Sequence, residues 1–307
     1  MASLQVNTYN QKGMREGLTD IVADLFADDA PLFRMAEKVR AIHTKVEWQT
    51  DALASSSTTA VAEGASLTFV QPGLRTRKSN YTHIRLRNWD VTFTQMATVV
   101  AGIRDQVARE VMKALKALVL DYEKILLNTG TTAAGGTATG RKCMGLQKAI
   151  VTNTAVGTGA GSSALIQLTE DNVNLLMQKV WVQGGDPRVL LCGGHQKRVI
   201  SKKFTAKTGF SFNIEASTRQ AIANINKYEG SFGTVDIVPD REHLKRRITI
   251  TTPDQVKIAV LRDITQYKGA PTASSLKGWV EAEMSLIFGN QLAHAKHSYL
   301  KFSGTIA

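Results

Sequence analysis

The chain has 307 residues, of which 43% are hydrophobic and 21% are charged, and its formal net charge is +12. This length and composition are typical of globular proteins with one or two compact units, and no apolar run approaches the roughly 18 residues that span a membrane. The charge predicts attraction to a polyanion without sequence-specific recognition, because the chain has no helix-turn-helix or zinc motif.

The first part of the chain predicts a flexible arm over residues 1–18, a short helix capped by Thr19, and a second short helix over 32–40. Strand-like alternation over 44–50 and again between 67 and 95 encloses a stretch of small residues, which indicates a long two-stranded excursion. Since an isolated hairpin is marginally stable in water, we expect this excursion to pack on a partner chain.

The most regular pattern lies at 101–128, where apolar residues recur every three or four positions and predict one amphipathic helix. A rise of about 1.5 Å per residue gives this helix a length of roughly 40 Å, which favours the role of a strut. The stripe consists of Ile103, Val107, Val111, Leu115, Leu118, Tyr122 and Ile125.

The region of about 164–262 predicts a compact α/β unit, with Thr169 as the cap of its first helix. The other elements predicted in this unit are a helix at 195–204 and strands at 188–192, 234–238, 248–252 and 256–261. A short helix is predicted before the unit, at 142–150, and two return strands within 278–302 are expected to close the unit that contains the long helix.

Two motifs have catalytic or ligand-binding potential but are better explained as structural. Gly157 to Ser163 is as glycine-rich as a phosphate-binding loop, but it lacks the lysine and the preceding strand that such a loop needs. Cys192 and His195 would need mutual contact and a third orienting group to act as nucleophile and base. We interpret Cys192, like Cys143, as a buried, reduced thiol.

Two further pairs of residues are also interpreted as having no metal-binding or catalytic role. His294 and His297 have no neighbouring carboxylates to complete a metal site. Glu281 and Glu283 share a face of a strand, and salt bridges between subunits explain them better than acid–base catalysis in so basic a chain. The sequence therefore predicts no catalytic, cofactor or metal site, and no enzyme.

Charged and aromatic residues of the excursion are the candidate inter-subunit contacts. In its second part, residues 83, 85, 87, 89, 91 and 93 share one face of a strand. We expect the aromatic members to be apolar anchors and the arginines to be polar bridges, while a solvated face or contact with a polyanion stay open as alternatives. The candidates are Trp48, Asp51, Arg75, Arg77, Lys78, Arg85, Arg87, Trp89 and Phe93, and a second basic group is Arg241, Lys245, Arg246 and Arg247.

Several short motifs follow one another along nearly the whole chain: Asp29–Leu32, Glu47–Asp51, Asp121–Leu127, Arg141–Leu146, Gly230–Gly233, Val238–Arg241 and Glu281–Asn290. Together with the order of the predicted elements, they resemble the major capsid proteins of tailed bacteriophages, of the Hong Kong phage type. Each motif is weak alone, and their order carries the resemblance.

The resemblance implies an α+β fold with an N-terminal arm (1–43), an extended β-hairpin loop (44–98), a peripheral domain with a spine helix (99–165), an axial α/β domain (166–265) and return strands (266–307). It implies a structural protein that assembles in the host cytoplasm, as hexamers and pentamers, into the icosahedral or elongated head of a virion. The implied partners are other copies of the chain, packaged double-stranded DNA on the inner face, and separate scaffolding, portal and decoration proteins. It implies no cofactor and no membrane.

Two other functions are alternatives. An encapsulin-like nanocompartment shell has the same fold and encloses protein cargo, so its contents would distinguish it. A basic nucleic-acid-binding protein would bind DNA as a monomer, with an affinity that falls steeply with salt. Relatives of the capsid type often have a scaffolding segment ahead of the arm, whereas here the arm begins near Met1, so we expect any scaffold to be a separate protein or to be unnecessary.

Overall fold

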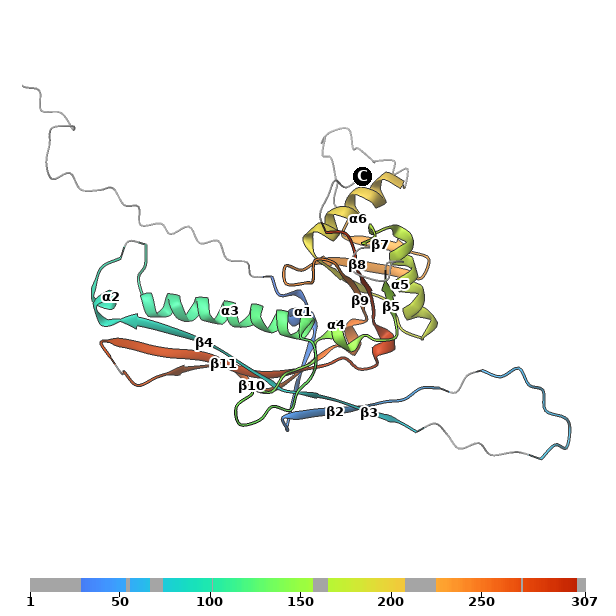
Figure 1. The fold of residues 1–307 in the computed structure, drawn as a ribbon, viewed down its shortest axis with the longest axis horizontal. Coiled ribbons are helices and arrows are strands. Elements are labelled where there is room, and N and C mark those ends of the chain that lie inside the picture. The colour runs from blue at the N-terminus through green and yellow to red at the C-terminus, as the bar shows by residue number, and fades with distance from the viewer. Residues whose placement is uncertain are drawn as a thin grey trace, which may run out of the picture.

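The structure is a computed structural model that describes residues 29–53, 56–66, 74–100, 102–156, 165–207, 225–271 and 273–302. The predicted arm, the helix capped by Thr19 and the glycine-rich stretch 157–163 lie outside these ranges. Figure 1 shows a long helix above one sheet, a second sheet with its own helices, and a two-stranded hairpin that projects from the body.

The first sheet has four strands in the order β1-β10-β11-β4, with β1 parallel to β10 and the other pairs antiparallel. The long helix α3 (Gln106–Asn128) lies along one face of this sheet (Figure 1). The Asp105 side chain caps α3 by accepting a hydrogen bond from the N–H of Ala108 at 3.1 Å. The strands are β1 (Glu37–Arg40), β4 (His83–Thr92), β10 (Lys257–Lys268) and β11 (Ser275–Ile287).

The predicted apolar stripe from Val107 to Ile125 packs in the core between α3 and the sheet, whereas Ile103 lies before the helix. Leu118, Tyr122 and Leu126 are fully buried there, together with Val280 and Met284 of β11. The Tyr122 hydroxyl donates to the carbonyl oxygen of Ala282 at 2.6 Å, so even the polar end of this ring is satisfied inside the core. The prediction of a long amphipathic helix is confirmed, but the helix begins at Gln106 rather than at 101, after a short helix α2 (Phe93–Ala97).

The second sheet has six strands in the order β5-β12-β9-β6-β8-β7. Helices α5 (Glu170–Val182) and α6 (Gly194–Lys207) contribute to the core on one face of this sheet, where Leu190 and Cys192 are buried. Leu191 points to the opposite face and joins the core of α3. The strands are β5 (Thr154–Val156), β6 (Val189–Cys192), β7 (Lys227–Gly230), β8 (Gly233–Pro239), β9 (Ile248–Thr251) and β12 (Ala295–Ser298).

Most predicted elements of the α/β unit are confirmed. Thr169 caps α5, because its hydroxyl oxygen accepts a hydrogen bond from the N–H of Asn172 at 3.4 Å. The strands predicted at 188–192, 234–238 and 248–252 are β6, β8 and β9, and the helix predicted at 195–204 is α6. The helix predicted at 142–150 is shorter, as α4 (Leu146–Ala149).

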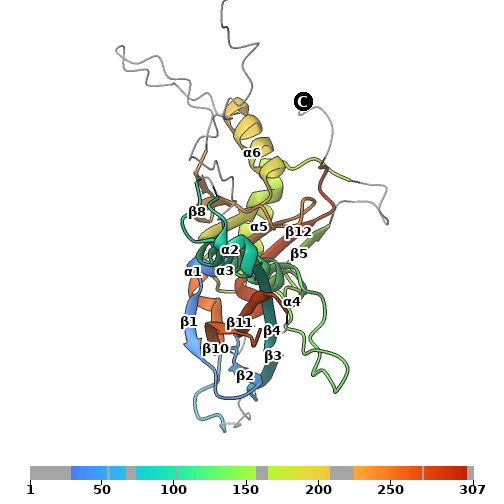
Figure 2. The same cartoon turned by 90° about the vertical axis from the view of Figure 1, so that its left-hand side faces the viewer.

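The projecting hairpin consists of β2 (Lys45–Thr50) and β3 (Thr76–Tyr81), paired antiparallel from Lys45 with Tyr81 to Thr50 with Thr76. We call β2, β3 and the described residues between them the extended hairpin. Figure 2 shows it below the four-stranded sheet, on the side away from α6. The remaining elements are α1 (Pro31–Met35) and the 3-10 turns η1 (Pro253–Gln255) and η2 (Gln291–Ala293).

Long-range pairing overturns several local predictions. The helix predicted over 32–40 ends at Met35, because Glu37 to Arg40 pair with β10 as a strand. The strand predicted at 256–261 is β10, and it pairs in the four-stranded sheet rather than in the α/β unit. The chain end predicted to return to the long helix is β12, which pairs with β9 and β5. Strand β4 pairs with β11, so the two-stranded part of the excursion ends at Tyr81.

Candidate assembly surface

The extended hairpin is fixed at its root by the fully buried amide of Asn80. Its Nδ2 donates to the carbonyl oxygens of Leu286 at 2.9 Å and Met144 at 3.1 Å, and its Oδ1 accepts from the N–H of Met144 at 2.8 Å. Because this amide bonds β11 and the segment before α4 at once, the root of β3 has a defined position in the core.

Trp48 is a second anchor of the extended hairpin. Its Nε1 donates to the carbonyl oxygen of Gly289 at 2.9 Å. Its ring meets the ring of Phe288 edge to face, with centroids 4.8 Å apart. Trp48 therefore holds the hairpin to its own subunit, and its contact with a neighbouring subunit stays a prediction.

Charged residues of the hairpin pair both along β2 and across the hairpin. Glu47 lies 2.6 Å from Lys45 and 3.0 Å from Arg77, and the hydrogen bond from Lys45 lowers the pKa of Glu47. Asp51 lies 3.4 Å from Arg75. These pairs are exposed and contribute little to stability in water. They do give the hairpin surface alternating charges that a neighbouring protein surface is able to complement.

Beyond β2 and β3, every described residue of the connecting loop is exposed. Leu53 is 100% exposed and Leu74 85% exposed, and Val61 is also exposed. A rigid root that carries apolar side chains away from the core is a poor arrangement for an isolated subunit. It is suited to contact with another chain.

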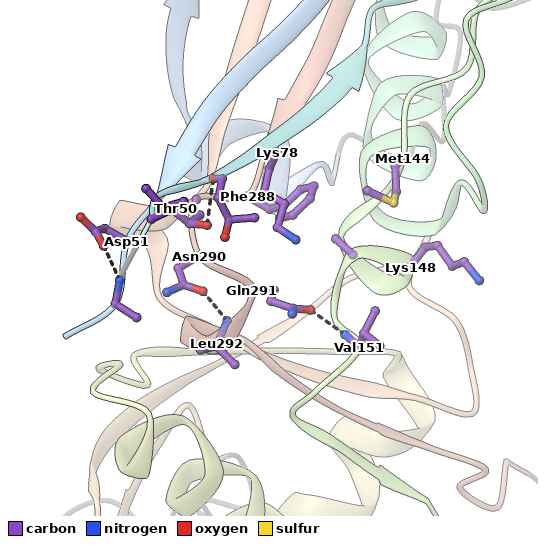
Figure 3. Close-up of a pocket in the computed structure, with 15 residues that line it drawn as sticks. Thr50, Asp51, Lys78, Met144, Lys148, Val151, Phe288, Asn290, Gln291 and Leu292 are labelled. Atoms are coloured by element: carbon purple, nitrogen blue, oxygen red, sulfur yellow. Dashed lines mark hydrogen bonds between the residues drawn. The ribbon is translucent and has the colours of Figure 1, made fainter. Parts of the chain in front are cut away.

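A cavity of about 590 Å³ lies between the loop-side ends of β2 and β3, α4 and η2 (Figure 3). Met144, Phe288 and Leu292 give it an apolar lining, and Lys78 and Lys148 reach it from two sides. Asp51 lies at the hairpin end of this cavity. The cavity therefore offers an apolar depression with charged edges next to the exposed loop.

Three other candidate inter-subunit contacts, Arg85, Arg87 and Trp89, have partners within their own subunit. Asp121 of α3 accepts hydrogen bonds from Arg85 Nε at 2.7 Å and from Arg87 Nε and Nη2, each at 2.6 Å. Trp89 is only 5% exposed and belongs to the α3 core. The shared strand face was predicted correctly, but it faces α3 rather than a neighbour. Phe93, the first residue of α2, keeps 42% of its surface exposed.

The two acidic residues of β11 are also paired inside the chain. Glu283 accepts from Arg141 Nη2 at 2.5 Å, from Arg262 Nε at 3.1 Å and from the Thr82 hydroxyl at 2.6 Å. Burial alone would raise the pKa of Glu283, but these hydrogen bonds outweigh it and lower the pKa. Glu281 bonds the same Arg262. Both glutamates were predicted to form salt bridges between subunits, and the structure instead shows salt bridges within one subunit.

A buried pair of carboxyl groups joins α1, α3 and the end of β8, and sequence reasoning missed it. Glu123 accepts hydrogen bonds from the N–H groups of Leu32 at 2.8 Å and Phe33 at 2.7 Å. Burial raises its pKa to about 8, and the nearby Asp240 carboxyl adds to this. We infer that the pair holds one proton at neutral pH. The available signal was that Glu123 lies three residues before Leu126, on the apolar side of the helix.

The motifs considered for catalysis have structural roles. His294 is buried, with its Nδ1 2.8 Å from the Thr251 hydroxyl and its Nε2 3.0 Å from the carbonyl oxygen of Phe288. Burial lowers its pKa to about 4, so this histidine is neutral. Cys192 is a buried free thiol, as is Cys143, and the ring of His195 lies against Phe302.

Two classes of site are absent from the part of the chain that the structure describes. No group of three or more His, Cys, Asp or Glu residues is arranged to hold a metal ion among these residues. Within the same ranges, no helix has the length and apolar character needed to cross a membrane.

The family model of the SU10 major capsid protein matches residues 3–301 of the chain. No curated protein matches the chain. Among solved structures, the cyanophage A-1(L) capsid asymmetric unit is 13% identical with a TM-score of 0.71, covering 94% of this chain and 97% of that chain. The capsid of a native GTA particle is 13% identical with a TM-score of 0.64, covering 96% and 97%. The SrpI encapsulin of Synechococcus elongatus is 11% identical with a TM-score of 0.62, covering 94% of both chains.

Proposed function

The chain belongs to the SU10 major capsid protein family, and we propose that its extended hairpin is the element that joins one subunit of the phage head to the next. The protein is a structural subunit that assembles with its own copies into the hexamers and pentamers of a shell. The observation that carries the proposal is the exposure of Leu53 and Leu74 on a hairpin whose root is fixed by Asn80 and Trp48.

A neighbouring subunit would bury what this subunit leaves exposed. Burial of apolar surface contributes about 25 cal/mol per Å², and each subunit repeats the contact around the shell, so modest contacts add up to a stable particle. The residues proposed for polar contacts are the exposed Asp51, Arg75 and Arg77 and the half-buried Lys78, with Phe93 as the apolar member. The depression lined by Phe288 and Leu292 is proposed to receive part of the neighbour.

The two sheets support a division of the subunit into two domains. We propose that α3 and the four-stranded sheet form the peripheral domain and that the six-stranded sheet with α5 and α6 forms the axial domain. We also infer a role without catalysis, because Cys192, His294 and Glu283 are each buried by packing or bonding within the fold. Assembly in the host cytoplasm, enclosed double-stranded DNA, and separate scaffolding, portal and decoration proteins complete the proposal.

The test is a variant in which residues 52–74 are replaced by an Asn-Gly turn, which suits a two-residue hairpin. We expect a folded subunit with an unchanged unfolding midpoint that no longer forms rings or shells in electron micrographs. As a finer pair, Leu74→Ser should lower particle yield, whereas Val182→Ser, at an exposed position on α5, should not. Normal shells from the shortened hairpin would refute the proposal.

The encapsulin alternative has the same fold, and the family match favours the phage capsid over it. The nucleic-acid-binding alternative is favoured only by the net charge of +12. Purified particles that contain protein cargo and no DNA would support the encapsulin function instead.

A further inference from the structure

Some cations of this chain are paired with carboxylates and others are not. Several lysines and arginines of the hairpin, α3 and the four-stranded sheet lie within 4 Å of carboxylates, as in the pairs Lys113–Glu110, Lys257–Glu37 and Lys277–Asp90. A different group of cations has no carboxylate within that distance among the described residues. We call this group the basic belt; it consists of Lys148, Lys245, Arg246, Arg247, Lys296 and Lys301.

Specific contacts make the belt continuous at one end. The buried Gln196 at the start of α6 donates from Nε2 to the carbonyl oxygens of Lys245 at 3.2 Å and Lys301 at 2.9 Å. The N–H of Leu300 donates to the carbonyl oxygen of Arg246 at 3.0 Å. The turn before β9 and the segment after β12 are therefore held side by side, with their cationic side chains at the surface.

The belt continues toward α4 through Lys296 of β12. The Lys296 ammonium donates to the carbonyl oxygen of Gln147 at 2.6 Å, which places it next to α4 and Lys148. Burial lowers the pKa of Lys296, and the neighbouring charges of Arg247 and Lys148 lower it further. Like charges are thus held close together at this end, and a bound anion would relieve their repulsion.

We propose that the basic belt is the surface on which the subunit contacts the phosphate backbone of packaged double-stranded DNA, and that the α4–β12 side of the axial domain therefore faces the interior of the shell. The inference rests on the proposed function, since it requires a shell that encloses DNA. Unpaired cations without a base-reading motif fit a partner whose charge repeats along its length and whose sequence varies. Arg241 is outside the belt, because it lies 3.7 Å from Asp29.

The first test compares two triple variants of the full chain that lose the same net charge. One is Arg246→Gln, Arg247→Gln and Lys296→Gln; the control is Lys113→Gln, Arg188→Gln and Lys277→Gln, whose cations are already paired. The binding constant of open rings of five or six subunits, in which the interior face is accessible, is measured for a short duplex DNA at several salt concentrations. We expect the belt variant to reduce the steepness of the plot of log K against log salt by about 2 to 3, and the control to leave it near the wild-type value. Equal slopes in the two variants would overturn the proposal.

A second readout needs no variant and so does not depend on folding. Lysines of DNA-filled and empty wild-type shells are acetylated and quantified by mass spectrometry. Lys148, Lys245, Lys296 and Lys301 should be protected severalfold in filled shells, while Lys113 and Lys277 should react equally in both. Equal labelling of the belt in filled and empty shells would overturn the inference and leave the shell function standing, whereas failure to obtain any shells would count against the function itself. Protection by an acidic protein in DNA-free shells would also overturn it.

Discussion

The indole ring of Trp89 lies against the backbone of Gly278 on the neighbouring strand, where an added β-carbon would come within 2.3 Å of the ring. The carbonyl oxygen of Tyr267 would lie 2.6 Å from the same carbon. A side chain at position 278 would therefore clash with both the core aromatic and the backbone of β10.

Substitution Gly278→Ala is expected to destabilise the subunit by about 1–3 kcal/mol, the usual cost of overpacking a core. Chemical denaturation of the purified protein measures this change. Gly194→Ala is the matched control, since nothing lies within 4 Å of the added carbon at the start of α6. A Gly278→Ala variant as stable as wild type would show that the ring and the strand have room to move.

The Glu123–Asp240 pair predicts a dependence of stability on pH. The folded-state pKa of Glu123 is about 8 against an ordinary 4.5, so the folded chain holds a proton that the unfolded chain releases, and the stability of the fold decreases as pH rises toward 8. Four buried or partly buried histidines have lowered pKa values and act in the opposite direction, namely His83, His243, His294 and His297. In the unfolded chain about half of each is still protonated at pH 6.5 and about a tenth at pH 7.5, so the window in which Glu123 dominates is about pH 7.5 to 8.

In that window the melting temperature of wild type should fall as pH rises. Asp240→Asn should flatten this dependence, because an amide N–H is able to donate to the ionised Glu123 and removes the need for the shared proton. Asp240 Oδ2 is buried without a hydrogen-bond partner among the described residues, which is where that donor would sit. A wild-type melting temperature that stays level or rises over this range would contradict the shared proton.

Trp48→Phe is expected to keep the edge-to-face contact with Phe288 and lose the hydrogen bond to Gly289, at a cost of about 1 kcal/mol. The loss should appear as faster amide hydrogen exchange in β2 and β3, with little change in α3. Gln49→Ala, on the opposite face of β2, serves as the control. Unchanged exchange in the Trp48→Phe variant would show that the hairpin root is held by Asn80 alone.

Asp121→Asn leaves two guanidinium groups without their shared carboxylate. We expect a loss of about 1–2 kcal/mol, because Asp121 is largely buried while the arginines stay partly exposed to water. Asp254→Asn breaks an exposed pair with Arg188 and should cost much less, because exposed ion pairs contribute little to stability in water. Equal effects of the two substitutions on the unfolding free energy would mean that the Asp121 cluster contributes no more to stability than an exposed salt bridge.

The sequence was sufficient wherever one segment decides its own structure. The stripe from Val107 to Ile125 predicted α3, and Thr169 predicted the start of α5. It was insufficient wherever a distant segment decides. Residues 37–40 form a strand only because β10 is available to pair with them. The period of two in β4 showed which residues share a face, but only the position of α3 determines that Arg85 and Trp89 point inward.

The central claim is that this chain is a shell subunit joined through its extended hairpin. The most direct measurement is the size of the purified full-length protein by light scattering and negative-stain microscopy, at low and at high salt. The account predicts closed particles, or rings of five and six subunits, and their loss when residues 52–74 are replaced by a two-residue turn. A monomer at every salt concentration that binds DNA tightly at low salt and releases it at high salt would contradict the account and support the nucleic-acid-binding function instead.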